Sequence, residues 1–251
     1  MRRFAPFLIP LLLTGCAAVT METAGEDVIA RAVEPSLRAA AANAEANNDW
    51  KGAAQHWGTL HQRHPEDTAI SLSLARSWRY GGQPQQAADL MQDTLSRTGR
   101  DVPVLIELGK DYLAAERLGL ALKILEEARA KAPDIWDIHS AMGVALDSLG
   151  RYPEAQGAYE RALELAPDNP VVLNNLGLSQ AQSGQLSIAI DTLQRANEHP
   201  GAGPQLRQNL ALLLALKGDA PAAERMAAKD LPPDMVRTNA GIYRTLAGAA
   251  R

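Results

Sequence analysis

Apolar residues recur along most of the chain at the three- and four-residue spacing of amphipathic helices. Glycine and proline fall at wide intervals between these segments, and strand-like runs of Val, Ile and Thr are missing from the sequence. Alanine, the best helix former, is abundant, and aromatic residues make up only 4% of the chain. The pattern predicts an all-α protein.

The helical segments repeat at an interval of about 34 residues. The stretch GRYPEAQGAYERALELAPDN, residues 150–169, is similar to the second half of a tetratricopeptide (TPR) repeat. Written in this period, the chain divides without insertions into the blocks 34–67, 68–101, 102–135, 136–169, 170–203 and 204–230. The resemblance implies a TPR superhelical solenoid of about six helix-turn-helix repeats.

Two places in each block, counted from the first residue of the block, hold only small residues. Place twenty is always alanine, and place eight is always glycine or alanine. Helices whose axes are roughly 8 to 10 Å apart tolerate no bulk where they cross, so we expect these residues at the crossing of each helix pair. Larger side chains at places seven and twenty-four should fill the flanks. The small residues are Ala53, Ala87, Ala121, Ala155, Ala189 and Ala223 at place twenty, and Ala41, Ala75, Gly109, Gly143, Gly177 and Ala211 at place eight.

Turn-forming residues fall where each helix pair must reverse direction. Glycines follow the first helix of several blocks, and prolines end the second helix of others. A heptad coiled coil would not place prolines on this schedule. The turn signals are Asn47-Asn48, Gly81-Gly82, Gly150, Gly184 and Gly218 after first helices, and Pro65, Pro133 and Pro167 after second helices.

The first 15 residues are typical of an export signal. Met1-Arg2-Arg3 is a cationic head, and the apolar run 4–13 is too short to cross a bilayer as a permanent helix. Leu13-Thr14-Gly15-Cys16 resembles the lipobox of bacterial lipoproteins. That resemblance implies that residues 1–15 are removed and that Cys16, the only cysteine, carries a diacylglyceryl group. An ordinary signal peptide with a chance cysteine is the alternative.

Lipid on Cys16 would hold a soluble body at a membrane, because each buried methylene contributes about 0.8 kcal/mol and two or three acyl chains act together. Residues 16–33 would then be the lipidated N-terminus and tether. Ala17 follows the cysteine, where an Asp resembles an inner-membrane retention signal in enterobacterial lipoproteins. We therefore expect the protein to be anchored at the periplasmic face of the outer membrane of a Gram-negative bacterium.

The C-terminal segment, residues 231–251, departs from the repeat. Leu231-Pro232-Pro233 stops the preceding helix, and Asp234 can cap a new one. Val236, Ala240, Tyr243 and Ala247 then stand near one face of that helix. We expect a capping helix and tail that close the apolar end of the solenoid.

Catalytic chemistry is not indicated. The sequence has no glycine-rich phosphate loop, no G-x-S-x-G elbow and no HExxH motif. His56, His61 and His64 cluster without a carboxylate or thiol that would fix a metal geometry. The formal net charge of −4 does not indicate a nucleic-acid surface. We predict a protein that is not an enzyme, with no cofactor, metal or small-molecule substrate, whose partners are proteins and a membrane.

A solenoid of this kind offers a concave face to a peptide or a partner helix. TPR cochaperones grip a C-terminal carboxylate with Lys and Asn at places five and nine of one repeat, and no block here reproduces that clamp, so chaperone tails are not expected. The face instead shows a gradient from basic to acidic to polar-apolar. Its residues are Arg38, Arg76, Arg79 and Lys110, then Asp137 and Asp147, then Asn174, Asn175, Leu178, Gln182 and Leu212.

The gradient has two interpretations. In the first, a partner lays an acidic stretch on the basic half and an amphipathic stretch on the later repeats. In the second, Glu45 and Glu107 neutralise the basic residues and the gradient is a solvated face. Asp147 is expected to tolerate substitution at little cost in stability.

The lipobox, the repeats and the ending NLALLLALKGDAPAAERMAAKDLPPDMVRTNAGIYRTLAG, residues 209–248, resemble the TadD family of TPR lipoproteins from tight-adherence (Flp) pilus systems. The resemblance implies a pilotin-like role in assembling a secretin or pilus machine. Two alternatives stay open. One is an adapter resembling NlpI or the type IVa pilus lipoproteins, which would scaffold cell-wall hydrolases or another secretin; the other is an enzyme whose site is not visible in the sequence.

Overall fold

The computed structural model describes residues 33–249. The export signal, Cys16 and almost all of the predicted tether lie outside the described residues. Within 33–249 every regular element is a helix and no strand is present. The all-α architecture expected from the sequence is confirmed.

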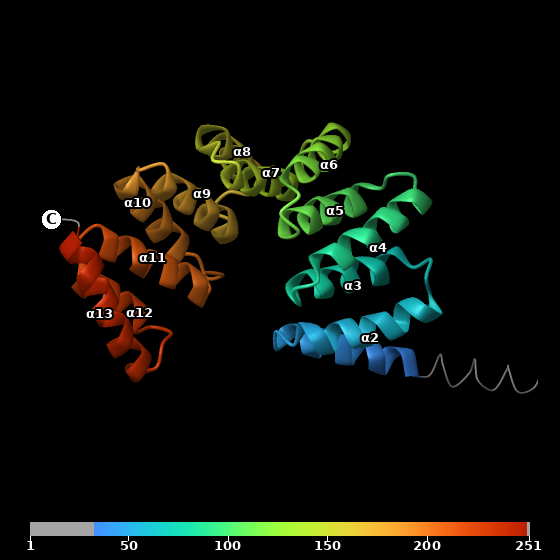
Figure 1. The fold of residues 1–251 in the computed structure, drawn as a ribbon, viewed down its shortest axis with the longest axis horizontal. Helices are drawn as coiled ribbons and strands as arrows, with labels where there is room; N and C mark the ends of the chain where they lie inside the picture. The colour runs from blue at the N-terminus through green and yellow to red at the C-terminus, as the bar shows by residue number, and fades with distance from the viewer. Residues whose placement is uncertain (1–32, 250–251) are drawn as a thin grey trace, which may run out of the picture.

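The helices alternate between an inner and an outer row along an open arc (Figure 1). From α3 to α11, each inner helix packs on the inner helices of the neighbouring pairs, whereas the outer helices from α2 to α10 pack only on inner ones. The inner row is the helix over 33–46, α3 (Thr68–Tyr80), α5 (Val102–Ala114), α7 (Trp136–Ser148), α9 (Pro170–Gln182) and α11 (Pro204–Leu216). The outer row is α2 (Trp50–Arg63), α4 (Pro84–Arg97), α6 (Leu118–Lys131), α8 (Tyr152–Leu165), α10 (Leu186–Asn197) and α12 (Ala220–Ala227).

The turn inside each pair uses one backbone conformation. The residue at place fifteen of every block has a positive φ, between 57° and 99°. Four of the six are glycine, which adopts this conformation without strain, and Asn48 is also tolerant of it. In the third block the position is Glu116, so the repeat imposes the same turn where the sequence carries no glycine. The six residues are Asn48, Gly82, Glu116, Gly150, Gly184 and Gly218.

The two helices of each pair cross at the small residues. A Cβ atom on Gly109 would lie 2.6 Å from Cδ2 of Leu125, and one on Gly177 would lie 2.9 Å from Cγ of Leu193. Place eight therefore faces the large side chain at place twenty-four of the same pair. The alanines at place twenty are fully buried, so no larger residue would fit there without moving a helix.

The array ends with α13 (Pro233–Ala249), which packs on α11 and α12. Ala240, Tyr243 and Ala247 are its buried side chains, and Val236 is half-buried. These residues cover apolar side chains of the last pair that would otherwise face solvent.

Candidate partner-binding groove

A groove follows the inner helices from α3 to α11. Its largest hollow, of about 470 Å³, is lined by residues of α3, α5, α7 and α9. A second hollow of about 230 Å³ lies between α7 and α9 and shares Val144 and Asn175 with the first. A third, of about 310 Å³, shares Val171 and continues to the start of α11. We refer to the three connected hollows as the inner groove.

The groove wall is largely apolar. Val171 and Tyr80 are 59% and 56% exposed there, the two largest exposed fractions among the large hydrophobic residues of 33–249. Tyr80 is held in place by Trp50, whose ring centroid lies 4.7 Å away, and by the Arg79 guanidinium 4.8 Å from the ring centre. Leu113 and Val144 complete the wall between α5 and α7. Such a surface gains free energy when a partner covers it.

Charges in the groove are paired with one another. Lys110 Nζ on α5 donates to Asp137 Oδ2 on α7 over 2.5 Å, at the edge of the largest hollow. Arg38 lies 3.5 Å from Asp67 in a more exposed pair. Lys110 and Asp137, which the sequence places in separate stretches of the gradient, therefore meet across neighbouring repeats.

Arg79 lies inside the stack, which corrects its assignment to an open basic surface. Its Nε donates to Asp111 Oδ1 over 2.9 Å, and its Nη2 donates to Glu107. The Arg79 side chain is 10% exposed and those of Asp111 and Glu107 are 0% and 6% exposed. The guanidinium joins α3 to α5, and only its edge reaches the groove.

Asp111 has an unusual environment for a carboxylate. It is fully buried, and its Oδ2 has no hydrogen-bond donor. Burial and the nearby Glu107 carboxylate raise the pKa of Asp111 from 3.8 to about 7, although Arg79 opposes the shift. The Arg79 guanidinium is thus paired with two buried carboxyl groups, those of Glu107 and Asp111.

Arg76 is the exception among the four basic residues. It is exposed on α3 and has no ion-pair partner among the described residues. Glu107 neutralises Arg79, in agreement with the second interpretation of the gradient, but Glu45 does not reach the basic residues. Glu45 accepts instead from Trp57 Nε1 over 2.7 Å and from Ser77 Oγ over 3.4 Å.

Asp147 is a structural acceptor, which overturns the expectation that it tolerates substitution. It accepts from Tyr159 Oη over 2.9 Å and from Ser179 Oγ over 2.6 Å. Burial raises the pKa of Asp147, and the two donors counteract the shift. Glu45 makes the equivalent contacts in the first pair. The sequence could have indicated this role of Asp147. In both blocks an acid at place twelve is followed by Trp or Tyr at place twenty-four and by Ser at place ten of the next block.

The later part of the groove carries amides and apolar side chains. Asn209 Nδ2 donates to Asn174 Oδ1 over 2.9 Å, which links α11 to α9. Asn175, Leu178 and Gln182 line the hollow between α7 and α9. Leu212 is 42% exposed on α11. The structure therefore brings Asn175, Leu178 and Gln182 into one hollow and leaves Leu212 outside the lining of the three hollows.

Two of the histidines near α2 lie beside side chains of other helices. His64 Nε2 lies 2.5 Å from Glu34 Oε1, and His61 Nδ1 lies 3.3 Å from Ser71 Oγ. Between residues 33 and 249 no three His, Cys, Asp or Glu side chains gather closely enough to hold a metal ion. Over the same range, no helix is both long and apolar enough to cross a membrane.

Family models describe the middle of the chain. A model of the tetratricopeptide repeat matches residues 106–170, and a second such model matches residues 158–191. These matches cover α7 and α8, where the helix pair has the small residues Gly143 and Ala155 at its crossing. The helix pairs within residues 106–191 thus match tetratricopeptide repeats, and the whole array has the fold of a TPR solenoid.

Two bacterial proteins are similar to parts of the chain. An uncharacterized protein of Sinorhizobium fredii, y4yS, is 34% identical over 110 residues, which are 44% of this chain and 60% of that protein. The TPR repeat-containing protein PA4667 of Pseudomonas aeruginosa is 31% identical over 149 residues, 57% of this chain and 25% of that protein. The chain thus spans less than two thirds of the length of either relative.

A solved structure shows the same fold. The TPR protein TTC0263 of Thermus thermophilus superposes with a TM-score of 0.62 at 20% identity. The match covers 70% of this chain and 98% of that one. At this identity the likeness concerns the TPR fold alone.

Proposed function

We propose that this TPR protein is a membrane-anchored adapter that holds a segment of a protein partner in the inner groove. The observation that carries the proposal is the hollow across α3 to α9, whose wall is largely apolar and has Tyr80 and Val171 exposed on it. TPR solenoids serve as protein-interaction scaffolds, and groove walls of this kind suit a peptide or helix better than a small polar substrate.

The charge pattern favours a segment with few charges of its own. Lys110 and Asp137 satisfy each other, and Arg79 is enclosed by two acids. An acidic partner would have to separate these pairs before it gained a contact, and separating the buried pairs of Arg79 is costly. Hydrophobic contacts and the amides of Asn175 and Gln182 are therefore the proposed source of affinity.

For the anchor we propose lipidation of Cys16, on the resemblance of Leu13-Thr14-Gly15-Cys16 to a lipobox. With Ala17 after the cysteine, the location we propose for the solenoid is the periplasmic face of the outer membrane. On the resemblance to the TadD family, the partner we propose is a secretin or another component of a tight-adherence pilus machine, and the role is pilotin-like.

Co-purification from envelope extracts tests the proposal. Val144 lines two of the three hollows, so Val144→Arg should remove the captured secretin from the eluate. Leu120→Arg is the matched control, because it places the same side chain on an exposed apolar site of α6 outside the inner groove. Thermal midpoints of both variants equal to that of the wild type would show that folding is intact.

The captured partner decides between the candidates. A secretin or pilus component lost in Val144→Arg and kept in Leu120→Arg supports the proposal. Cell-wall hydrolases captured in its place would support the NlpI-like alternative. Capture that is equal for both variants would contradict a role for the inner groove.

A further inference from the structure

The inner groove contains one carboxylate that no cation neutralises. Two carboxylates line its three hollows, those of Asp137 and Asp147. Lys110 pairs with Asp137, and Arg79, the other basic residue of the lining, is held by two buried acids. Among residues 33–249, no basic side chain forms an ion pair with Asp147, and both of its hydrogen bonds come from neutral hydroxyl groups.

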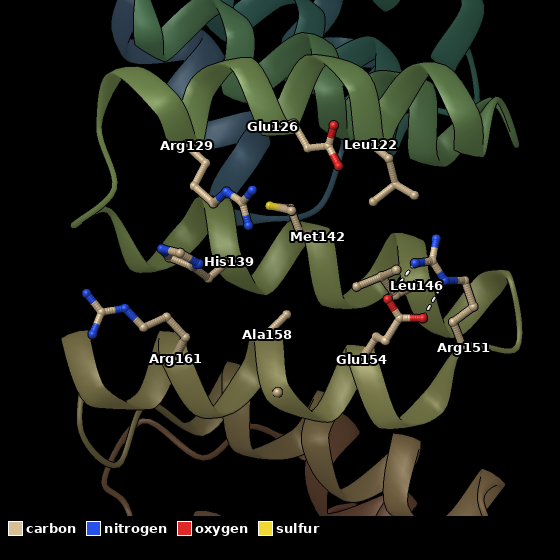
Figure 2. Close-up of a pocket in the computed structure, with 11 residues that line it drawn as sticks. Leu122, Glu126, Arg129, His139, Met142, Leu146, Arg151, Glu154, Ala158 and Arg161 are labelled. Atoms are coloured by element: carbon tan, nitrogen blue, oxygen red, sulfur yellow. Dashed lines mark hydrogen bonds and ion pairs between the residues drawn. The ribbon is translucent and has the colours of Figure 1, made fainter.

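Asp147 differs in this respect from acids on the other side of α7. Figure 2 shows that side, where Arg151 Nε donates to Glu154 Oε1 over 2.7 Å. Arg161, on the same helix as Glu154, donates to Glu164 over 2.6 Å. These two acids have a cation within hydrogen-bond distance, whereas the charge of Asp147 is left uncompensated.

Asp147 is half-buried and lines the hollow of about 230 Å³ between α7 and α9. Its Oδ2 accepts from Tyr159 Oη and its Oδ1 from Ser179 Oγ, so each oxygen keeps a lone pair for a further donor. Burial raises the pKa of Asp147, and only the two hydroxyl donors counteract the shift. The side-chain amides of Asn175 and Gln182 line the same hollow and carry further acceptor oxygens. This combination of acceptors around a negative charge suits an ammonium or guanidinium group.

A partner segment that covers the inner groove also covers Asp147. Val144 lines both this hollow and the largest one, and Asp147 lies three positions further along α7, on the same side of the helix. An uncharged segment over Val144 would therefore remove water from a carboxylate without replacing it, which costs free energy. A cation on the segment avoids that cost and adds an attraction that is stronger away from water. The groove thus discriminates by charge even though its cations are already paired.

We infer that the segment held in the inner groove carries one Lys or Arg, whose charged end enters the hollow between α7 and α9 and pairs with Asp147. The inference rests on the proposed function, because it names a residue of the partner that the groove holds. Apolar residues of the segment flank this cation and cover the wall at Tyr80 and Val171. A segment with Asp or Glu at that point is repelled by Asp147.

Selection of peptides from a displayed random library against the full-length chain tests this inference. Peptides of about 12 residues reach about 40 Å when extended, enough to cross the groove from α3 to α9. Selected peptides are expected to hold Lys or Arg at one position of a mainly apolar sequence. Replacing that residue by Gln should lower the affinity for the wild-type protein at least tenfold. Rising salt should weaken the binding of the original peptide more than that of the Gln peptide.

Two variants of the protein make the test specific. Asp147→Asn removes the charge but can keep both hydroxyl contacts, because the amide oxygen accepts from one hydroxyl and the NH₂ group donates to the other. It should bind the original peptide at least tenfold more weakly than the wild type does, and the Gln replacement in the peptide should then have little further effect. Glu45→Gln is the matched control, because Glu45 makes the equivalent contacts with Trp57 and Ser77 outside the lining of the three hollows. It should leave the affinity unchanged, and thermal midpoints check the folding of both variants.

The outcomes separate this inference from the proposed function. Selected peptides that Val144→Arg no longer binds, but that show no enrichment of Lys or Arg, would overturn the inference and leave the proposed function standing. The same holds if the Gln replacement weakens binding equally in the wild type and in Asp147→Asn, since the cation then pairs elsewhere. A selection without binders, or peptides that bind Val144→Arg as tightly as the wild type, would count against the inner groove itself and so against both.

Discussion

Gly143 on α7 lies directly against the ring of Tyr159 on α8. A Cβ atom at position 143 would be 2.5 Å from Cε1 and 2.7 Å from Cζ of that ring. The ring cannot move away easily, because Tyr159 is 1% exposed and its hydroxyl donates to Asp147. The crossing of the fourth repeat therefore depends on the absence of a side chain at position 143.

Gly143→Ala should lower the free energy of unfolding by about 1 to 3 kcal/mol, since the added methyl group overpacks the crossing. Gly157→Ala on α8 is the control: its Cβ meets nothing within 4 Å, and alanine should stabilise the helix by up to about 1 kcal/mol. Chemical denaturation measures both changes. Destabilisation of the same size in both variants would show that helix propensity, and not the Tyr159 contact, governs position 143.

Asp147→Ala should lower the free energy of unfolding by about 1 to 3 kcal/mol, because it leaves two buried donors without an acceptor. Those donors are the hydroxyls of Tyr159 and Ser179. Asp191→Ala on α10 removes an exposed carboxylate that has no partner among the described residues, and it should change stability by less than about 0.5 kcal/mol. If both variants have the same denaturation midpoint, the hydrogen bonds of Asp147 contribute nothing net.

The sequence predicted those parts of the fold that depend on local chemistry. The small residues at places eight and twenty predicted a close crossing of the two helices of each pair. Gly143 and Ala155 lie at such a crossing between α7 and α8. Glycine marked the turns at residues 82, 150, 184 and 218. Glu116 was not identified as a turn residue, since nothing in a glutamate indicates a positive φ and only the repeat frame requires it.

The groove was harder to predict because its contacts join residues about one repeat apart. Arg79 and Asp111 are separated by 32 positions, as are Asp147 and Ser179. Helical periodicity showed that Arg79 and Asp147 lay on the inner helices, but not that the superhelix would bring the next helix over them. Arg76, three residues from Arg79, stays exposed because it lies on the part of α3 that no neighbouring helix covers.

Arg79→Ala should destabilise the protein by about 3 to 5 kcal/mol, because it leaves Glu107 and Asp111 buried without their cation. Arg76→Ala removes the same charge from the same helix at an exposed site and should cost less than about 0.5 kcal/mol. Thermal unfolding of the two variants side by side measures the contrast. Equal midpoints would mean that Arg79 is solvated in solution.

Cys16→Ser tests the proposed lipid anchor. The variant should keep the helical circular dichroism of the wild type but move from the membrane to the soluble fraction, or accumulate with its signal uncleaved, because the acyl chains are the proposed attachment. Fractionation followed by mass spectrometry of the N-terminal peptide measures both outcomes. Membrane retention of the variant at the wild-type level would contradict the lipoprotein assignment.

The stability of the protein should depend on pH through Asp111. The folded-state pKa of about 7 exceeds the value of 3.8 for the free side chain, so the folded state holds a proton that the unfolded chain releases. The contribution of this group is fully present below about pH 4, falls as the pH rises toward 7, and is lost above that value. Asp111→Asn keeps an acceptor for Arg79 and cannot ionise, so this variant should lose less stability between about pH 5 and pH 8 than the wild type does.

Glu160→Gln is the control for the pH experiment, because it removes one negative charge from an exposed site on α8 and should keep the wild-type pH profile. Urea denaturation at several pH values gives the slope of the unfolding free energy for all three proteins. A wild-type slope retained in Asp111→Asn would show that another group takes up the proton.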